Sequence, residues 1–255
     1  MIDILRAKLE HYVASRAIPS VSGRRRLRLE ADDRSAATPA NHGEFSGAAM
    51  DHSDWDAVLK AHVTEGARVG DVEGVSTVDY AGVAADDRFR RYLEALAHAD
   101  VEKLSPSDRL ALFLNAYNAL CVGLIVAHER GCGAAPLGSI TELSTPALKV
   151  WDKPAGVVGG REVSLGEIEH VHLRGGWDEP AIHACIVCAS ASCPNLRREA
   201  FVPATLREQM DEQMARWLAN PTKGLAWDAA SSTLSLSRIF LWFADDFGPT
   251  TSAAA

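Results

Sequence analysis

The chain has 255 residues, a formal net charge of -8 and 47% hydrophobic residues. Its acidic balance excludes nucleic-acid binding through bulk charge, because neutralising phosphates requires a basic surface. The composition is typical of a soluble globular protein that can bury a core, and it indicates no particular activity.

The N-terminal segment predicts a short helix followed by a linker. Ile2, Leu5, Leu9 and Val13 have helical spacing, and the charged residues among them exclude a secretory signal. Residues 20–49 are rich in Arg, Ala, Ser and Asp and lack an apolar period, which predicts disorder. We therefore expect an N-terminal extension over residues 1–49, an ordered domain over 50–248 and a disordered tail over 249–255.

Apolar spacing predicts helices through the first half of this domain. We expect helices over residues 55–63 and 89–97, with a short strand over 75–80 between them. A third, strongly apolar helix follows Pro106 and includes residues 110–127. This stretch is near the length of a membrane span, but Asn115, Tyr117 and Asn118 lie in its middle, so we predict a buried core helix and no membrane span.

The second half of the domain mixes short strands and helices. Gly159-Gly160 predicts a turn that leads into a hairpin arm over residues 161–163. Ser164 and Glu167 form a capping-box pattern, residues 181–189 are compatible with a strand, and 203–218 have helical spacing. Residues 234–243 predict a strand followed by a helical turn. The fold class is therefore α+β, a single mixed helical domain with a small β-sheet.

Two amides lie on one face of the predicted core helix. Asn115 and Asn118 are three residues apart, and the rest of that face is apolar, so each amide must find partners inside the protein. In one interpretation they are structural and tie loops to the helix. In the other, one of them orients a catalytic group or donates to an oxyanion.

A second polar segment contains Glu169, His170, His172 and Arg174. On a helix, Glu169 and His172 lie three residues apart, while His170 and Arg174 lie four apart. This set could bind a metal, act as acid and base, or form an exposed charged face. The spacing alone does not choose among these roles.

Cys193 is the candidate nucleophile. Pro194 favours the first position of a helix, which would place Cys193 at a helix N-terminus, where free N–H groups and the dipole lower the pKa of a thiol. His183, on the predicted strand just before it, would be the base. The alternative is that Cys193 is a small packing residue at a helix start.

The cysteines also bear on location and on metals. Their number is odd, five, and with no signal peptide this predicts free thiols in a reducing compartment, the cytoplasm. A zinc site built from His170, His183, Cys188 and Cys193 is the alternative to a cofactor-free protein, although the paired spacing of a structural zinc site is absent.

These segments together resemble DUF547, a family of unknown function, over residues 54–248. The family name supplies no activity, and the sequence has no heptad repeat of the kind that accompanies the domain in plants. Glu179-Pro180-Ala181 lacks the basic residue expected before the histidine. The pieces that carry the resemblance occur in family order: Val78-Asp79-Tyr80, Leu114-Asn-Ala-Tyr-Asn118, Val150-Trp151, Gly159-Gly160-Arg161, Ile168-Glu169-His170, Leu173-Arg174, His183-Ala184, Cys188-Ala-Ser-Ala-Ser-Cys193-Pro194 and Phe240-Leu-Trp242-Phe-Ala-Asp245-Asp246-Phe247.

Our leading hypothesis is a cysteine-dependent hydrolase or acyltransferase with papain-like or transglutaminase-like logic. Cys193 would attack an acyl carbon of a peptide-like or acyl substrate, and His183 would take its proton. Glu169 or Asn118 would orient the imidazole, and Asn115 would help to hold the oxyanion. Three alternatives remain open: His170 as the base in place of His183, a metal-binding or a non-enzymatic interaction domain, and thiol redox chemistry between Cys188 and Cys193.

Overall fold

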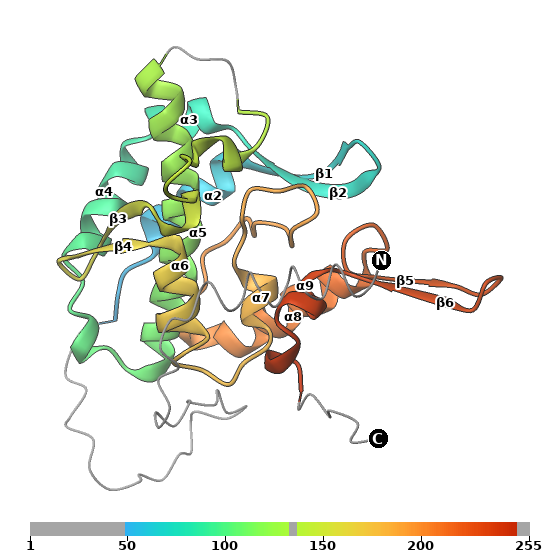
Figure 1. The fold of residues 1–255 in the computed structure, drawn as a ribbon. Helices are drawn as coiled ribbons and strands as arrows, with labels where there is room; N and C mark the ends of the chain where they lie inside the picture. Colours follow the sequence, from blue (N-terminus) through green and yellow to red (C-terminus); the bar gives the residue numbers. More distant parts are fainter. Residues whose placement is uncertain (1–48, 133–136, 249–255) are drawn as a thin grey trace, which may run out of the picture.

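One long apolar helix, α5 (Pro106–Cys132), forms the centre of the structure (Figure 1). This computed structural model describes residues 49–132 and 137–248, so the predicted helix near the N-terminus, almost all of the predicted disordered extension and the tail after 248 lie outside the described residues. The helix begins at Pro106, where a proline costs no backbone hydrogen bond, as the sequence predicted. It is long and apolar enough to cross a membrane, but 83% of its most apolar window is buried by the surrounding protein.

The first half of the described chain packs against this helix. It consists of α2 (Ser53–His62), β1 (Val63–Val69), β2 (Val72–Val78), α3 (Tyr80–Ala85), α4 (Asp87–Ala97) and the short η1 (Val101–Lys103). The predicted helices are therefore present, and the strand predicted over residues 75–80 is β2, which begins earlier and ends at Val78, where the unpredicted helix α3 soon follows. The strand β1 was not predicted, and the helix that we expected to include Val63 ends one residue earlier.

Two aspartates start the helices that follow β2. The side chain of Asp79 accepts a hydrogen bond from the N–H of Gly82, and Asp86 accepts from the N–H of Arg88. Each bond satisfies a backbone donor that the first turn of a helix leaves free. These caps explain why two separate helices, α3 and α4, form where the chain would otherwise continue as a loop.

A hairpin and a helical segment follow α5. Two short turns, η2 (Ile140–Leu143) and η3 (Val150–Asp152), lead to β3 (Pro154–Val158) and β4 (Arg161–Ser164). Gly159 and Gly160, with φ of 57° and 73°, make the turn between these strands, as predicted. Ser164 then caps α6 (Leu165–Glu167) through the N–H of Glu167, and the chain continues as the π-helix η4 (Ile168–Leu173).

The predicted strand over residues 181–189 is wrong. Residues in this run form the short helix α7 (Ile182–Cys185), after which the chain continues as a loop. The N–H of Ile186 donates to the carbonyl of Ile182 at 3.2 Å and completes the helical turn. Short apolar runs suit a buried helix as well as a buried strand, so periodicity could not decide between them.

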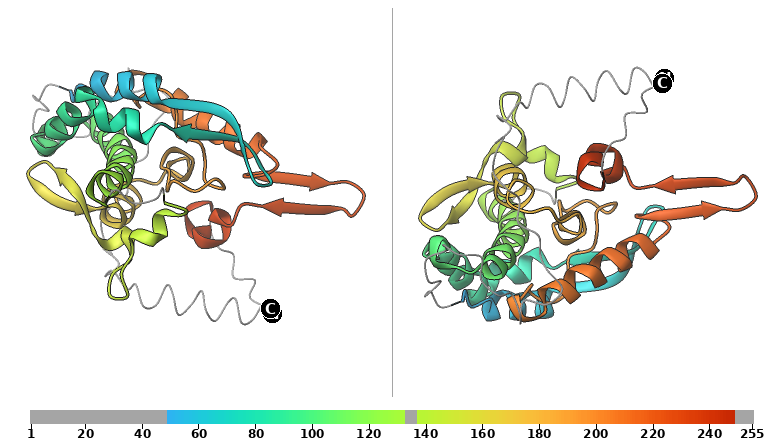
Figure 2. Two further views of the ribbon diagram at one scale, coloured as in Figure 1. Left: turned by 90° about the horizontal axis from the view of Figure 1, so that it is seen from above. Right: turned by 90° about the horizontal axis from the view of Figure 1, so that it is seen from below.

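The last part of the described chain carries one longer helix and a hairpin. It contains η5 (Pro203–Thr205), α8 (Leu206–Ala219), β5 (Leu225–Asp228), β6 (Thr233–Leu236), α9 (Ile239–Trp242) and η6 (Ala244–Asp246). Figure 2 shows β5 and β6 reaching away from the helices in both views. The helix over residues 203–218 and the strand and turn over 234–243 match the predictions.

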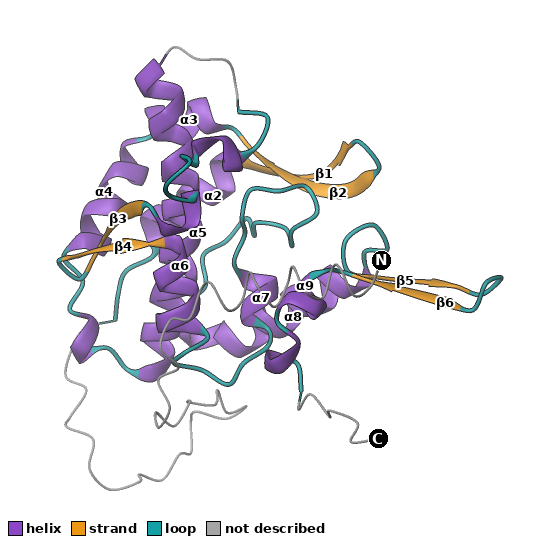
Figure 3. Cartoon of the chain, in the orientation of Figure 1, coloured by secondary structure: helices purple, strands orange, loops and turns teal. Residues whose placement is uncertain are grey.

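The strands pair only as hairpins among the described residues. β1 with β2, β3 with β4, and β5 with β6 form three separate antiparallel pairs, as the colours in Figure 3 make clear. The α+β class is confirmed, but three hairpins stand in place of the one small sheet that we expected. Isolated hairpins are marginal on their own, so their order depends on what each one packs against.

The hydrophobic core surrounds α5 on all sides. Trp55 of α2 stacks on Tyr92 of α4 at 5.8 Å, and together they cover one end of the core. Each fully buried Leu or Phe contributes roughly 1.5–3 kcal/mol through removal of apolar surface from water. The fully buried leucines of α5 are Leu110, Leu112 and Leu114.

Candidate functional site

The two buried amides of α5 hold two loops by their backbones. Asn118 donates from Nδ2 to the carbonyl of Cys185 and accepts from the N–H of Val187, both at 2.9 Å. Asn115 makes the same pair of bonds with Phe201, at 2.7 Å to its carbonyl and 2.9 Å from its N–H. Each amide thereby satisfies backbone groups that would otherwise be buried without partners. This arrangement agrees with the structural interpretation of both residues.

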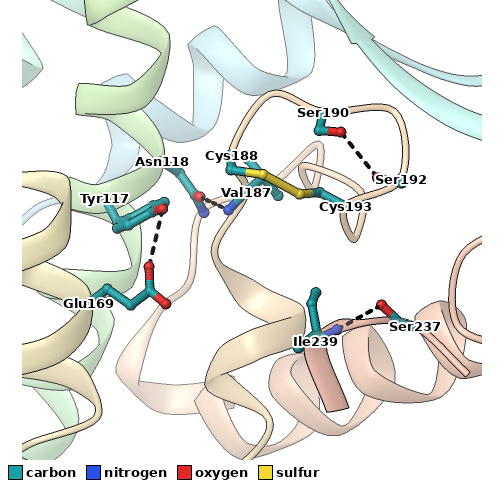
Figure 4. Close-up of a disulfide and its surroundings, with 10 residues drawn as sticks. All are labelled: Tyr117, Asn118, Glu169, Val187, Cys188, Ser190, Ser192, Cys193, Ser237 and Ile239. Carbon is teal, nitrogen blue, oxygen red and sulfur yellow. Dashed lines mark hydrogen bonds between the residues drawn. A yellow bond between two sulfur atoms is a disulfide. The ribbon is translucent and has the colours of Figure 1, made fainter. Parts of the chain in front are cut away.

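Asn118 fixes the start of a loop closed by a disulfide. Cys188 follows Val187 directly and is bonded to Cys193, as Figure 4 shows. No helix follows Pro194, so the prediction that Cys193 caps a helix is wrong. The prediction of free thiols is also wrong for these two cysteines, and the cytoplasmic location loses part of its basis. A sulfur in a disulfide is no thiolate, so the nucleophile hypothesis requires that this bond first be reduced.

A polar cluster lies where η4, α7 and η6 meet. The Nε2 atom of His183 lies 2.9 Å from Oδ2 of Asp246, and Nε of Arg174 lies 2.5 Å from the same oxygen. Arg174 also donates from Nη1 to Nδ1 of His170 at 3.0 Å. Residues from three separate segments of the chain thus share one network, and 63 residues separate His183 from its carboxylate.

The hydrogen bonds determine the protonation of both histidines. An ionised carboxylate only accepts, so Nε2 of His183 carries the proton and Nδ1 of a neutral ring is left as the basic atom. A guanidinium only donates, so Nδ1 of His170 is the acceptor and its Nε2 carries the proton. The cluster therefore holds two imidazoles of defined tautomer next to one carboxylate.

Burial and charge oppose one another in this cluster. Burial lowers the pKa of His183, and its hydrogen bond to Asp246 counteracts that effect only in part. Burial disfavours the ionised form of Asp246, but the hydrogen bonds from His183 and Arg174 outweigh burial and hold its pKa well below the usual range. At neutral pH the result is a neutral, proton-accepting His183 beside an ionised Asp246.

Aromatic rings cover the cluster. Phe243 stacks on the ring of His183 with centroids 4.3 Å apart, and the guanidinium of Arg174 lies 4.5 Å from the centre of the Phe243 ring. Phe247 packs against His183 at 5.4 Å. These contacts limit the rotation of the imidazole and keep bulk water from the pair, which strengthens its electrostatic interactions.

Glu169, one of the two residues predicted to orient the imidazole of His183, contacts Tyr117 and His170. Its Oε2 accepts from the hydroxyl of Tyr117 at 3.5 Å, an interaction drawn in Figure 4. Its Oε1 lies 4.0 Å from Nδ1 of His170. Glu169 and His170 therefore belong to the side of the cluster that faces α5.

The orienting carboxylate is the residue that sequence reasoning missed. Asp246 lies in the C-terminal motif that carried part of the family resemblance, but no role was assigned to it, nor was Arg174 given a site role. The available signal was a pair of adjacent carboxylates, Asp245-Asp246, in an otherwise aromatic segment.

A metal centre finds no support among the described residues. No group of three or more His, Cys, Asp or Glu side chains there is arranged to hold a metal ion. Two of the four proposed ligands, Cys188 and Cys193, are joined to each other, and a disulfide sulfur is not a zinc ligand. The donor set predicted for zinc does not fit this oxidised form.

The segment that carries most of this site is similar to a known family. Residues 101–218 match the family model DUF547, protein of unknown function. The match confirms the resemblance over the DUF547 segment, which contains both amides, Glu169, His170, His183 and the disulfide. Asp246 lies after it. No curated protein and no solved structure matches the chain.

Proposed function

We propose that the domain is a thiol-dependent hydrolase or acyltransferase, with His183 and Asp246 as the base pair and Cys193 as the nucleophile after reduction of its bond to Cys188. The observation that carries the proposal is the part-buried bond of 2.9 Å between Nε2 of His183 and Oδ2 of Asp246. A carboxylate that fixes the tautomer and position of a neutral imidazole is the arrangement that prepares a histidine to take a proton.

Reduction is the first requirement of this proposal. A dithiol donates two electrons to the disulfide, which releases Cys188 and Cys193 as thiols. The Cys193 sulfur then loses its proton to Nδ1 of His183 and attacks an acyl carbon. The leaving group takes up that proton, and water or a second acceptor releases the acyl group from the sulfur.

The remaining predicted site residues have supporting roles in this proposal. Asn118 positions the loop that carries Cys188 and Cys193 and does not contact the imidazole. Asn115 bonds to both backbone groups of Phe201, which gives it a structural role, so we no longer place it at the oxyanion. Arg174 supplies a positive charge beside Asp246, and His170 remains the alternative base on the other side of Arg174.

The substrate class follows from the chemistry of the reacting groups only. An acyl ester, thioester or peptide-like amide meets the chemistry of a thiolate and an imidazole. A reducing cytoplasm would keep the pair of cysteines open, so the cytoplasmic location stays a prediction that agrees with this proposal. No cofactor is required for the steps above.

The test is pre-steady-state acylation by p-nitrophenyl acetate. The reduced protein should release a burst of nitrophenol and carry an acetyl group on Cys193, detected by peptide mass spectrometry. Cys188→Ser should show the burst without added reductant, because Cys193 is then permanently free. The matched variant Cys193→Ser should show none.

The histidine is tested with the same assay. His183→Asn in the Cys188→Ser background should slow the burst by about 10²-fold or more, the usual contribution of a positioned base. An undiminished burst in that variant, or acetylation of Cys188 in place of Cys193, would show that the site does not work in this way.

A further inference from the structure

A ribbon with one apolar face extends from the body of the protein. β5 and β6 form the hairpin that reaches away from the helices in Figures 1 and 2. A hydrogen bond of 2.8 Å from the N–H of Ser237 to the carbonyl of Gly224 closes its base. The hairpin takes no part in the polar cluster around His183.

The register of the hairpin places all its large apolar side chains together. Leu225 lies opposite Leu236, and Trp227 lies opposite Leu234. Opposite residues of an antiparallel pair share a face, and alternate residues along a strand do too, so these four side chains form one face. Leu225 is 38% exposed, Trp227 is 60% exposed, and Leu234 and Leu236 are each 50% exposed.

A ribbon of this composition is expected to be covered. A single two-stranded hairpin is at best marginally stable in water, and a contiguous exposed apolar patch marks an interaction surface. The reverse face holds the small and polar residues Ala226, Asp228, Thr233 and Ser235. This is the alternation of a strand pair that has one face against a partner and one face toward water.

We propose that this face, the Leu225–Trp227–Leu234–Leu236 face, binds the same face of a second copy of the chain. A two-fold axis would stack the two ribbons face to face, and two uncharged apolar strips meet there without charge repulsion. Residues 225–236 include a single charged residue, Asp228, so closing the contact desolvates no ion pair.

Charge argues against a membrane as the occupant. The chain has a net charge of -8, and the ribbon has neither Lys nor Arg. Anionic lipid surfaces attract clusters of basic residues, so they would repel this protein.

The available area indicates a reversible dimer. At the exposures above, the four side chains uncover roughly 400 Å² per copy, given that a Trp alone presents about 200 Å² when fully exposed. The total, about 800 Å² for both copies, lies below the roughly 1,200 Å² at which stable specific interfaces begin, so the contact is a weak, reversible one.

Sedimentation velocity of the full chain at increasing concentration tests the proposal. The sedimentation coefficient should rise from that of a monomer to that of a dimer. The double variant Trp227→Thr/Leu234→Thr, which keeps strand-forming residues, should stay monomeric with an unchanged circular dichroism spectrum. Val69→Thr, which changes an exposed apolar residue of the other long hairpin, should dimerise like the wild type.

Hydrogen exchange of the wild type supplies a readout that needs no variant. Amides of residues 225–236 should gain protection as protein concentration rises. Three results would overturn the proposal. The wild type could be monomeric at every concentration, the double variant could still dimerise, or Val69→Thr could weaken the dimer as much as the double variant does. Protection that does not depend on concentration would also overturn it, because the ribbon would then be covered within its own chain.

Discussion

Replacing Asn118 with Leu tests how the disulfide loop is held. Leu is close to Asn in volume, but it cannot bond to the carbonyl of Cys185 or the N–H of Val187, which lie 2.9 Å from the Asn118 amide. Both backbone groups belong to buried residues, and an unsatisfied buried group costs roughly 1–3 kcal/mol. Partial relaxation of the loop offsets some of that cost. We expect the free energy of unfolding to fall by about 3 kcal/mol.

Urea unfolding followed by circular dichroism, with the disulfide kept oxidised, measures this change. Asn115→Leu is the matched variant, because Asn115 makes the equivalent two bonds to Phe201. Both variants should lose similar stability, but only Asn118→Leu should make the Cys188–Cys193 bond open faster to a dithiol. A loss below about 1 kcal/mol would mean that water or a shifted loop satisfies these groups, and the reasoning would fail.

Further predictions concern the cysteines and a buried histidine. The Cys188–Cys193 bond closes a short loop with a sequence separation of 5, so its reduction should lower the free energy of unfolding by about 2 kcal/mol. Urea unfolding curves with and without dithiothreitol measure this difference, and identical curves would contradict the prediction. In the reduced native protein, iodoacetamide should label these two cysteines and spare Cys121 and Cys185 until denaturation. Burial raises the pKa of both spared thiols, to about 12 for Cys121. Early labelling of Cys121 or Cys185 would refute the burial argument. Burial lowers the pKa of His52 to about 4, below its ordinary value of 6.5, so between these values the unfolded state binds more protons and stability should fall as the pH falls. As the pH is lowered across this window, the melting temperature of His52→Asn should fall less steeply than that of the wild type. Equal slopes in the two proteins would assign the pH dependence to other groups.

The parts of the fold that the sequence predicted well have strong local signals. Pro106 and the long apolar run specify where α5 begins and that it is buried, whatever packs around it. The hairpin at Gly159-Gly160 follows from the need for positive φ at both turn residues. The amides of Asn115 and Asn118 were predictable as buried groups with partners, because an apolar helix face leaves an amide no access to water.

The parts that failed have weak or competing local signals. A proline after Cys193 suits a helix start, but a helix also needs residues that continue it. The segment after Pro194 is instead held as a loop by side chains from elsewhere, such as Ser76, whose hydroxyl accepts from the N–H of Leu196 at 2.9 Å. The spacing of Cys188 and Cys193 differs from Cys-x-x-Cys, so it did not single out their pairing.

Asp246 shows why the site could not be completed from local patterns. Its bond to His183 joins residues 63 positions apart, and no periodicity within either segment carries information about the other. The residue also lies beyond the 101–218 match, so the family segment alone includes the histidine without its carboxylate. In a protein that ended at residue 218, His183 would lose the acceptor for Nε2 as well as the Phe243 and Phe247 rings that cover it. The candidate site that the geometry defines therefore extends past the family match to η6 in the C-terminal segment.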